Sequence, residues 1–279
     1  MINKIYTCLW FDGKAQEAAK YYCSAFNHSK LLSENDIVSL FEVEGTKIMC
    51  LNGGPHYKHT PAVSQFITCE EDSEIERLWN HLSKDGKVLM ALGKYDWSEH
   101  YGWCEDKFGV SWQIFKGKMS EVKQKIVPCF LFVGKSFGKA EAALKLYTSV
   151  ITNSKIEGIL KYENTQSDLD GKVLHSQFRL NDTVFMAMDG PGEHHYTFSP
   201  ATSFVIECET QQEIDYYWEK LGEGGIYNQC GWLDDQFGIS WQIIPKVLQE
   251  LMSDPERAPR VVQAFLKMQK FDIQALLKA

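Results

Sequence analysis

The feature that most limits how this chain can fold is an internal repeat: its two halves are diverged copies of one sequence. Residues 4–11 recur as residues 125–132, and 66–70 recur as 205–209. The strongest match joins 101–114 to 230–243, where most positions are identical. Three matched blocks in the same order indicate a duplication, so the fold must be built from one domain used twice.

The repeat predicts the domain boundaries. A chain of 279 residues gives each copy enough length to bury its own core. We expect a first domain over 1–118, a second over 125–245, and a tail over 246–279 that has no counterpart in the first copy. The tail shows helical patterns at 246–252, 256–268 and 273–277, with Asp254 as an N-cap. Its apolar face is expected to pack across both domains.

Each copy shows an α+β pattern. Ile5–Phe11 is a β-rich run, and 14–26 carries apolar residues at helical spacing. Strand-like segments follow at 37–43 and 47–51, and the plan then begins again at Val63. This second unit is expected to contain a helix capped by Asp72 or Ser73 and later strands, and the second copy repeats the scheme. The expected elements are strands 63–69, 87–92, 102–107, 110–115, 156–162 and 173–180, and helix 72–82.

Composition excludes several classes of partner. The formal net charge of −8 argues against nucleic acid, because phosphate binding needs a basic face. Apolar runs stay well short of 18 residues, so we expect no membrane span. With no signal peptide at Met1, a cytoplasmic location is expected. The eight cysteines form no Cys-x-x-Cys pair, which favours reduced, mostly buried thiols.

Several motifs resemble one known family. The resemblance rests on Phe11–Lys14 and on segments 52–55 and 60–64, on Trp79, and on the block from Gly102 to Gln113. The second copy keeps corresponding segments at 199–203, 213–215 and 232–245, and the tail at 254–273 is similar too. Together they resemble the PhnB-like group, labelled 3-demethylubiquinone-9 3-methyltransferase-like, of the vicinal oxygen chelate superfamily. This superfamily also includes glyoxalases, bleomycin-resistance proteins and dioxygenases.

The resemblance implies a tandem of glyoxalase/bleomycin-resistance-like domains, each of two βαβββ modules, plus the helical tail. Two modules curl a sheet around a cleft that holds metal or substrate, so four modules imply two clefts. The chain would be a monomer that mimics a domain dimer, or a homodimer. Metalloenzymes of the superfamily place His, Glu or Gln ligands on inward-facing strand positions. Those positions fall at Ile5 or Tyr6, Met49 or Cys50, Ser64, Gln113, Ile126 or Val127, Phe185 or Met186, Ser203 and Gln242.

This set is poor in metal donors. Gln113 and Gln242 alone carry usual ligand groups, and a neutral amide binds divalent ions weakly. We therefore predict no cofactor and no metal site, although a divalent metal stays possible. The loop histidines His56, His59 and the pair 194–195 are expected to be solvated. No motif identifies a catalytic residue, and no Gly-rich strand–loop–helix supports the methyltransferase label.

What remains is an aromatic, mostly neutral cleft suited to a flat organic ligand. Strand alternation separates Gln113 from Trp112, so Trp112 and Trp241 should face the helices. Trp103 and Trp232 follow glycines and could line the cleft mouth. The candidate ligand-binding residues are Trp10, Ser64, Trp103, Gln113, Ser203, Trp232 and Gln242.

Three functions stay open from the sequence. The first is a small-molecule binding protein whose metal site has been lost. The second is a metal-dependent lyase, isomerase or dioxygenase, which would need a His/Glu set. The third is a duplicated, non-catalytic scaffold that acts through its tail. Metal analysis and deletion of 254–279 distinguish them.

Overall fold

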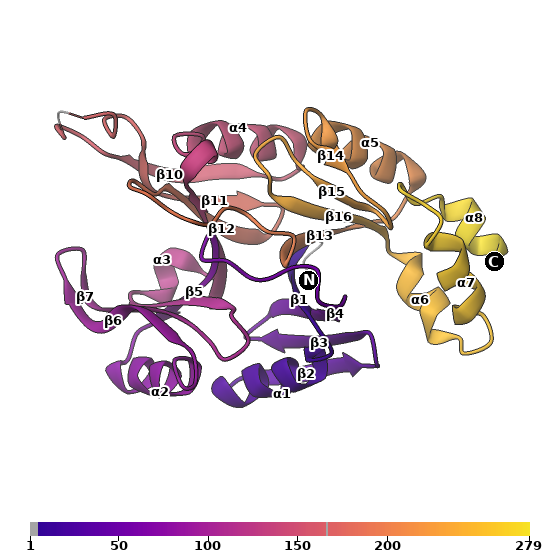
Figure 1. The fold of residues 1–279 in the computed structure, drawn as a ribbon, viewed down its shortest axis with the longest axis horizontal. Helices are drawn as coiled ribbons and strands as arrows, with labels where there is room; N and C mark the ends of the chain where they lie inside the picture. The colour runs from indigo at the N-terminus through magenta and orange to yellow at the C-terminus, as the bar shows by residue number, and fades with distance from the viewer. Residues whose placement is uncertain (1–4, 166) are drawn as a thin grey trace.

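The computed structural model describes residues 5–165 and 167–279, which form four βαβββ modules and a helical tail (Figure 1). The first copy holds the first two modules, and a short helix, α3 (Met119–Val122), leads into the second copy. The first module contains β1 (Ile5–Phe11), α1 (Ala15–Ala25), β2 (Ser29–Glu34), β3 (Val38–Val43) and β4 (Thr46–Asn52). The second contains β5 (Val63–Cys69), α2 (Asp72–Leu82), β6 (Lys87–Tyr95), β7 (Ser98–Glu105) and β8 (Ser111–Lys116).

The second copy repeats this order with an extra turn before its first helix. Its first module contains β9 (Ile126–Phe132), the 3₁₀ turn η1 (Gly134–Ser136), α4 (Ala140–Val150), β10 (Lys155–Lys161), β11 (Val173–Leu180) and β12 (Thr183–Asp189). Its second module contains β13 (Thr202–Cys208), α5 (Gln211–Gly222), β14 (Ile226–Tyr227), β15 (Trp232–Asp234) and β16 (Ser240–Pro245). The tail forms α6 (Val247–Ser253), α7 (Ala258–Phe265) and α8 (Ile273–Lys278).

The two sheets join modules of different copies. Sheet A has the strand order β14-β15-β16-β13-β1-β4-β3-β2, so it joins the first module to the fourth. Sheet B has the order β10-β11-β12-β9-β5-β8-β7-β6 and joins the third module to the second. The seams are the antiparallel pairs β1–β13 and β9–β5. The cleft residues were grouped by copy from the sequence, and the sheets correct this: each inner face takes residues from both copies.

The two larger hydrophobic cores, in contrast, are each built mostly from one copy, although Ile5, Ala62 and Val63 join the core of the second copy and Ile126 that of the first. In the first copy, α1 and α2 bury a core that includes Tyr22, Ile75 and Trp112. In the second copy, α4 and α5 bury the corresponding residues, among them Tyr147 and Trp241. Both tryptophans are fully buried and face the helices, which confirms the prediction from strand alternation. The opposite, inner face of each sheet carries a separate, smaller cluster.

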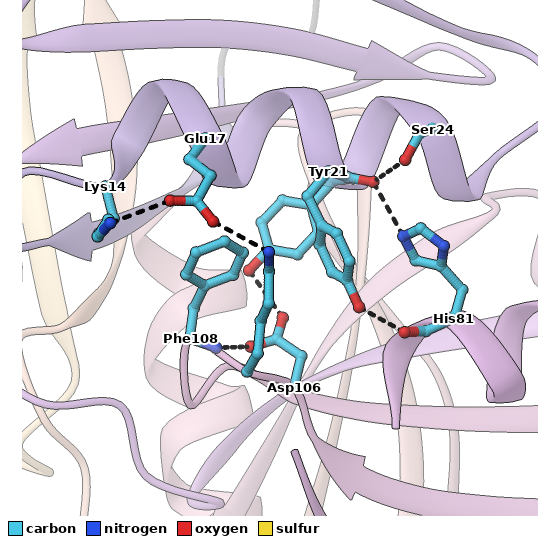
Figure 2. A network of polar contacts seen from close by, with 9 residues as sticks. Lys14, Glu17, Tyr21, Ser24, His81, Asp106 and Phe108 are labelled. Atoms are coloured by element: carbon cyan, nitrogen blue, oxygen red, sulfur yellow. Dashed lines mark hydrogen bonds and ion pairs between the residues drawn. The ribbon is translucent and has the colours of Figure 1, made fainter. Parts of the chain in front are cut away.

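A buried carboxylate fastens the two modules of each copy. Asp106 Oδ2 accepts hydrogen bonds from Tyr22 OH and Trp112 Nε1, both at 2.8 Å, and its other oxygen accepts from two backbone N–H groups of the β7–β8 turn. Figure 2 shows Asp106 and Phe108 of this network beside Glu17, which bridges Lys14 and Lys107, and beside the contact between Tyr21 and His81. Asp235 repeats the arrangement in the second copy. The hydrogen bonds of these two aspartates thus give the most similar block of the repeat a structural role.

The tail packs on the second copy, at the outer end of sheet A (Figure 1). Cys230 N donates to Met268 O and Gly231 N to Gln269 O, while the Phe271 ring lies against Gly231. Its buried residues belong to the core of the second copy. The expectation that the tail packs across both domains was therefore wrong. The backbone groups and the glycine that contact the tail lie at Cys230 and Gly231, just before β15 of the second copy.

Other local expectations hold in part. The strands 5–11 and 63–69 and the helix 72–82 agree with their predicted bounds, whereas the edge strand β2 was not predicted, because Lys30, Ser33 and Glu34 break its apolar pattern. Asp72 does not cap α2, since it binds His100 and Lys116 instead. The eight cysteines all lie in the described residues and form no disulfide. Within the described ranges, no helix is long and apolar enough to cross a membrane.

Candidate functional site

A trio of neutral polar side chains lies at the centre of each inner face. In sheet A, Cys8 on β1 lies opposite Ser203 on β13, and Gln242 Nε2 donates to Ser203 Oγ at 2.9 Å. In sheet B, Cys129 lies opposite Ser64, and Gln113 Nε2 donates to Ser64 Oγ at 2.6 Å. The serines and glutamines of these trios occupy strand positions where the family resemblance places metal ligands.

The trios are closed and uncharged. The exposed fractions of Gln113 and Gln242 are 5% and 6%, and the other four residues are more deeply buried. Burial raises the pKa of the Cys8 and Cys129 thiols to about 12, so both stay protonated at neutral pH. A protonated thiol is neither a good nucleophile nor a good metal ligand.

The donor chemistry at these positions does not fit a divalent metal. Hard and borderline ions need carboxylate, imidazole or thiolate ligands, whereas each trio offers a thiol, a hydroxyl and an amide already bonded to one another. The fourth strand adds Met49 in sheet A and Met186 in sheet B, because Cys50 and Phe185 face the helices. Among the described residues, no group of three or more His, Cys, Asp or Glu side chains could hold an ion.

One residue of each trio, the cysteine, was not among the predicted positions. The first-strand position was predicted at Ile5 or Tyr6 and at Ile126 or Val127. Tyr6 and Val127 do face inward, whereas Cys8 and Cys129 lie two residues further on, opposite the serines. The repeat contained the signal, since Cys8 and Cys129 align in the two copies. The exact strand register, which sequence periodicity does not fix, decides which inward residue lies at the centre.

An open pocket of about 420 Å³ lies at the mouth of sheet B. Trp103, on the inner face of the sheet, lines this pocket, and it is the direct partner of Gln113 in the β7–β8 register. The other copy contributes Tyr196, so neither copy builds the pocket alone. The remaining lining residues are His59, Thr60, Pro61, Lys87, Leu89 and Glu105.

The mouth of sheet A is occupied by Trp10. Its ring packs edge-on against Trp232 at 5.7 Å and Tyr57 at 5.1 Å, which are the repeat counterparts of Trp103 and Tyr196. Trp10 Nε1 also donates to Gly54 O at 2.6 Å. In sheet B the repeat counterpart of Trp10 is the smaller Leu131. We refer to the opening lined by Trp103 and Tyr196 as the sheet B mouth.

Two loops, one from each copy, hold the sheet B mouth in shape. Thr60 Oγ1 donates to Thr197 O at 2.7 Å, and Ser199 Oγ donates to Lys58 O at 2.8 Å. Trp103 Nε1 donates to Ser111 Oγ at 2.7 Å, which fixes the plane of its ring. The walls are therefore largely preformed, as small-molecule sites commonly are.

His59 differs from the expected solvated loop histidine. Its Nε2 lies 3.0 Å from Trp10 O and its Nδ1 lies 3.1 Å from Thr202 Oγ1. Because a carbonyl can only accept, Nε2 carries the proton and Nδ1 accepts from the threonine hydroxyl. Burial lowers the pKa of His59 to about 4, so it is neutral at physiological pH. His194, in contrast, lies on an exposed loop, with Nε2 3.0 Å from Pro191 O.

The structure thus divides the seven predicted ligand residues. Trp103 lines the sheet B mouth and pairs with Gln113, which donates to Ser64. In sheet A, Trp10 packs against Trp232, and Gln242 donates to Ser203. Sequence reasoning missed Tyr196, Lys87 and Glu105. Tyr196 could have been found as the repeat counterpart of Tyr57. Its position beside Trp103, however, depends on the way each sheet joins modules of different copies.

Paired βαβββ modules that join edge to edge into eight-stranded sheets define a vicinal oxygen chelate fold. The model of the family described as 3-demethylubiquinone-9 3-methyltransferase matches residues 3–115 and 124–244, so the chain belongs to this family. No curated protein compared with the chain matches it.

Two solved structures illustrate the likeness. A putative 3-demethylubiquinone-9 3-methyltransferase, PhnB protein, from Bacillus cereus is 36% identical over 41% of this chain and 100% of its own, with a TM-score of 0.40. Glyoxalase I from Zea mays is 13% identical over 90% of this chain and 95% of its own, with a TM-score of 0.56. The second likeness extends over all four modules and shows the fold alone.

Proposed function

We propose that this protein binds a small, flat organic molecule at the sheet B mouth without the aid of a metal. The observation that carries the proposal is the open pocket between Trp103 and Tyr196. At the corresponding place in sheet A, the indole ring of Trp10 packs against Trp232 instead. A volume of about 420 Å³ lies within the range of sites for small organic ligands.

The lining indicates the chemistry of the ligand. The Trp103 and Tyr196 side chains offer aromatic surface for stacking. Lys87 and Glu105 face each other in the β6–β7 register and contribute one charge of each sign. His59 is neutral. A site without net charge, with a donor and an acceptor beside aromatic rings, favours an uncharged planar molecule that carries a polar group.

The test is to close the pocket. Leu131→Trp copies the occupied mouth of sheet A, and the backbone should accept the indole, because Gly190 faces Leu131 as Gly53 faces Trp10. Leu131→Met, which nearly conserves volume, is the matched control. Calorimetric titration with 1-naphthol and 1-naphthamide should show binding to the wild type and the Met variant, and at least tenfold weaker binding to the Trp variant.

Equal affinity in all three proteins would refute the location of the site. Metal analysis tests the other half of the proposal: stoichiometric Zn, Ni, Mn or Fe that resists dialysis would contradict metal-free binding. Circular dichroism and the urea midpoint of the Trp variant distinguish a closed pocket from a misfolded protein.

A further inference from the structure

A second pocket, of about 530 Å³, lies on the other side of His59 and has a different chemistry. It opens between the end of β1, the start of α1 and the β7–β8 turn. Its lining consists of Trp10, Phe11, Asp12, Lys14, Glu17, Tyr57, Lys58, His59, Lys107, Phe108 and Gly109. We propose that this pocket, which we call the lysine pocket, binds a small planar organic anion such as an aromatic carboxylate.

The aromatic side of the lysine pocket is fixed in place. Trp10 is held by its bond to Gly54 O, and a Cβ at Gly53 would lie 2.2 Å from its ring, so only glycine fits there. Phe11 packs edge-on against Phe108 at 5.8 Å. These rings, with the partly exposed Tyr57, form a rigid wall on which a flat molecule can stack.

The charged side favours an anion. Three lysines and two carboxylates line the pocket, so its net charge is positive. Glu17 accepts from Lys14 at 3.1 Å and from Lys107 at 3.0 Å, which holds both ammonium groups beside its carboxylate (Figure 2). All three residues line the pocket. Lys58 forms no ion pair with a described residue. Lys14 and Glu17 belong to the start of α1, so the positive end of that helix dipole also faces the pocket.

The second copy lacks this combination. There Trp10 is replaced by Leu131, Lys107 by Gln236 and His59 by Phe198. The counterpart of Glu17 is Ala142, and the neighbouring Glu141 pairs with Lys145 and Lys161 on the surface of its own module. The aromatic wall and the cation above it therefore occur together once in the described part of the chain.

The experiment uses 1-naphthoate and its neutral amide, titrated into the Leu131→Trp protein so that the sheet B mouth is closed. Naphthoate should bind more tightly than naphthamide. Lys58→Ala should weaken naphthoate binding roughly tenfold and Lys58→Glu further, because an ion-paired contact is lost and then reversed. Lys84→Ala, an exposed lysine outside the pocket, should change nothing.

Several outcomes would overturn the proposal: no naphthoate binding at millimolar concentration, equal affinity for acid and amide, or equal affinity in the Lys58 and Lys84 variants. Since Lys58 is exposed and uses only its backbone oxygen in the fold, its variants should remain folded. Loss of naphthol binding at the sheet B mouth would leave these results unaffected, so the two sites fail or succeed separately.

Discussion

At the scale of single residues, His59 should make the folded protein less stable at acid pH. Its pKa is about 4 in the folded protein and about 6.5 in an unfolded chain. As pH falls, the unfolded state takes up the proton first, so the stability that neutral His59 provides is complete above about pH 6.5 and is lost toward pH 4. The loss should amount to about 3 kcal/mol in the free energy of unfolding.

Urea denaturation at pH 7.5 and 4.5 measures this loss. In His59→Gln the difference between the two pH values should shrink by about 2 kcal/mol or more, since the amide does not titrate. Burial also lowers the pKa of His81 and His175, so the wild type and the variant share that background. An undiminished difference in the variant would show that His59 is not neutral and buried in solution.

At the scale of elements, the buried carboxylates join helix to hairpin. Asp235 accepts from Tyr147 OH at 2.6 Å and Trp241 Nε1 at 2.9 Å, which ties α4 to the β15–β16 turn. Asp235→Asn would set an NH₂ group against two of these donors, and buried unsatisfied donors cost about 2–4 kcal/mol together. Tyr147→Phe removes one donor and should cost about 1 kcal/mol. Chemical denaturation compares the two, and equal costs would contradict this account.

Most elements could be predicted from sequence because their periodicity reports which face is buried. The spacing of Ala15, Ala18 and Tyr22 is enough to define the buried stripe of α1. The inner faces were harder to predict. Cys8 and Tyr6 both point inward, and only the pairing of β1 with β13 shows that Cys8 meets Ser203. The sheet B mouth depends on a loop that the second copy contributes. The hydrophobic pattern of a single segment does not show which distant loop that segment contacts.

At the scale of the whole molecule, the crossed sheets and the separate cores make each copy incomplete. A single copy buries its own helices, but it leaves β1 and β5, or β9 and β13, without their partners at the seams. Exposed strand edges of this kind drive association. We therefore expect the chain to behave as two interlocked halves joined by one connection.

Co-expression of fragments 1–118 and 119–279 tests this expectation. The fragments should associate one to one and restore naphthol binding, because the sheet B mouth takes Trp103 from one copy and Tyr196 from the other. Fragment 1–118 alone should self-associate or aggregate in size-exclusion chromatography, because its unpaired β1 and β5 need a substitute partner. If fragment 1–118 were a stably folded monomer that does not bind the other fragment, the strand pairs at the seams would contribute little to the stability of the fold. The duplication would then be two independent domains, and the mouth between them could not be a preformed site.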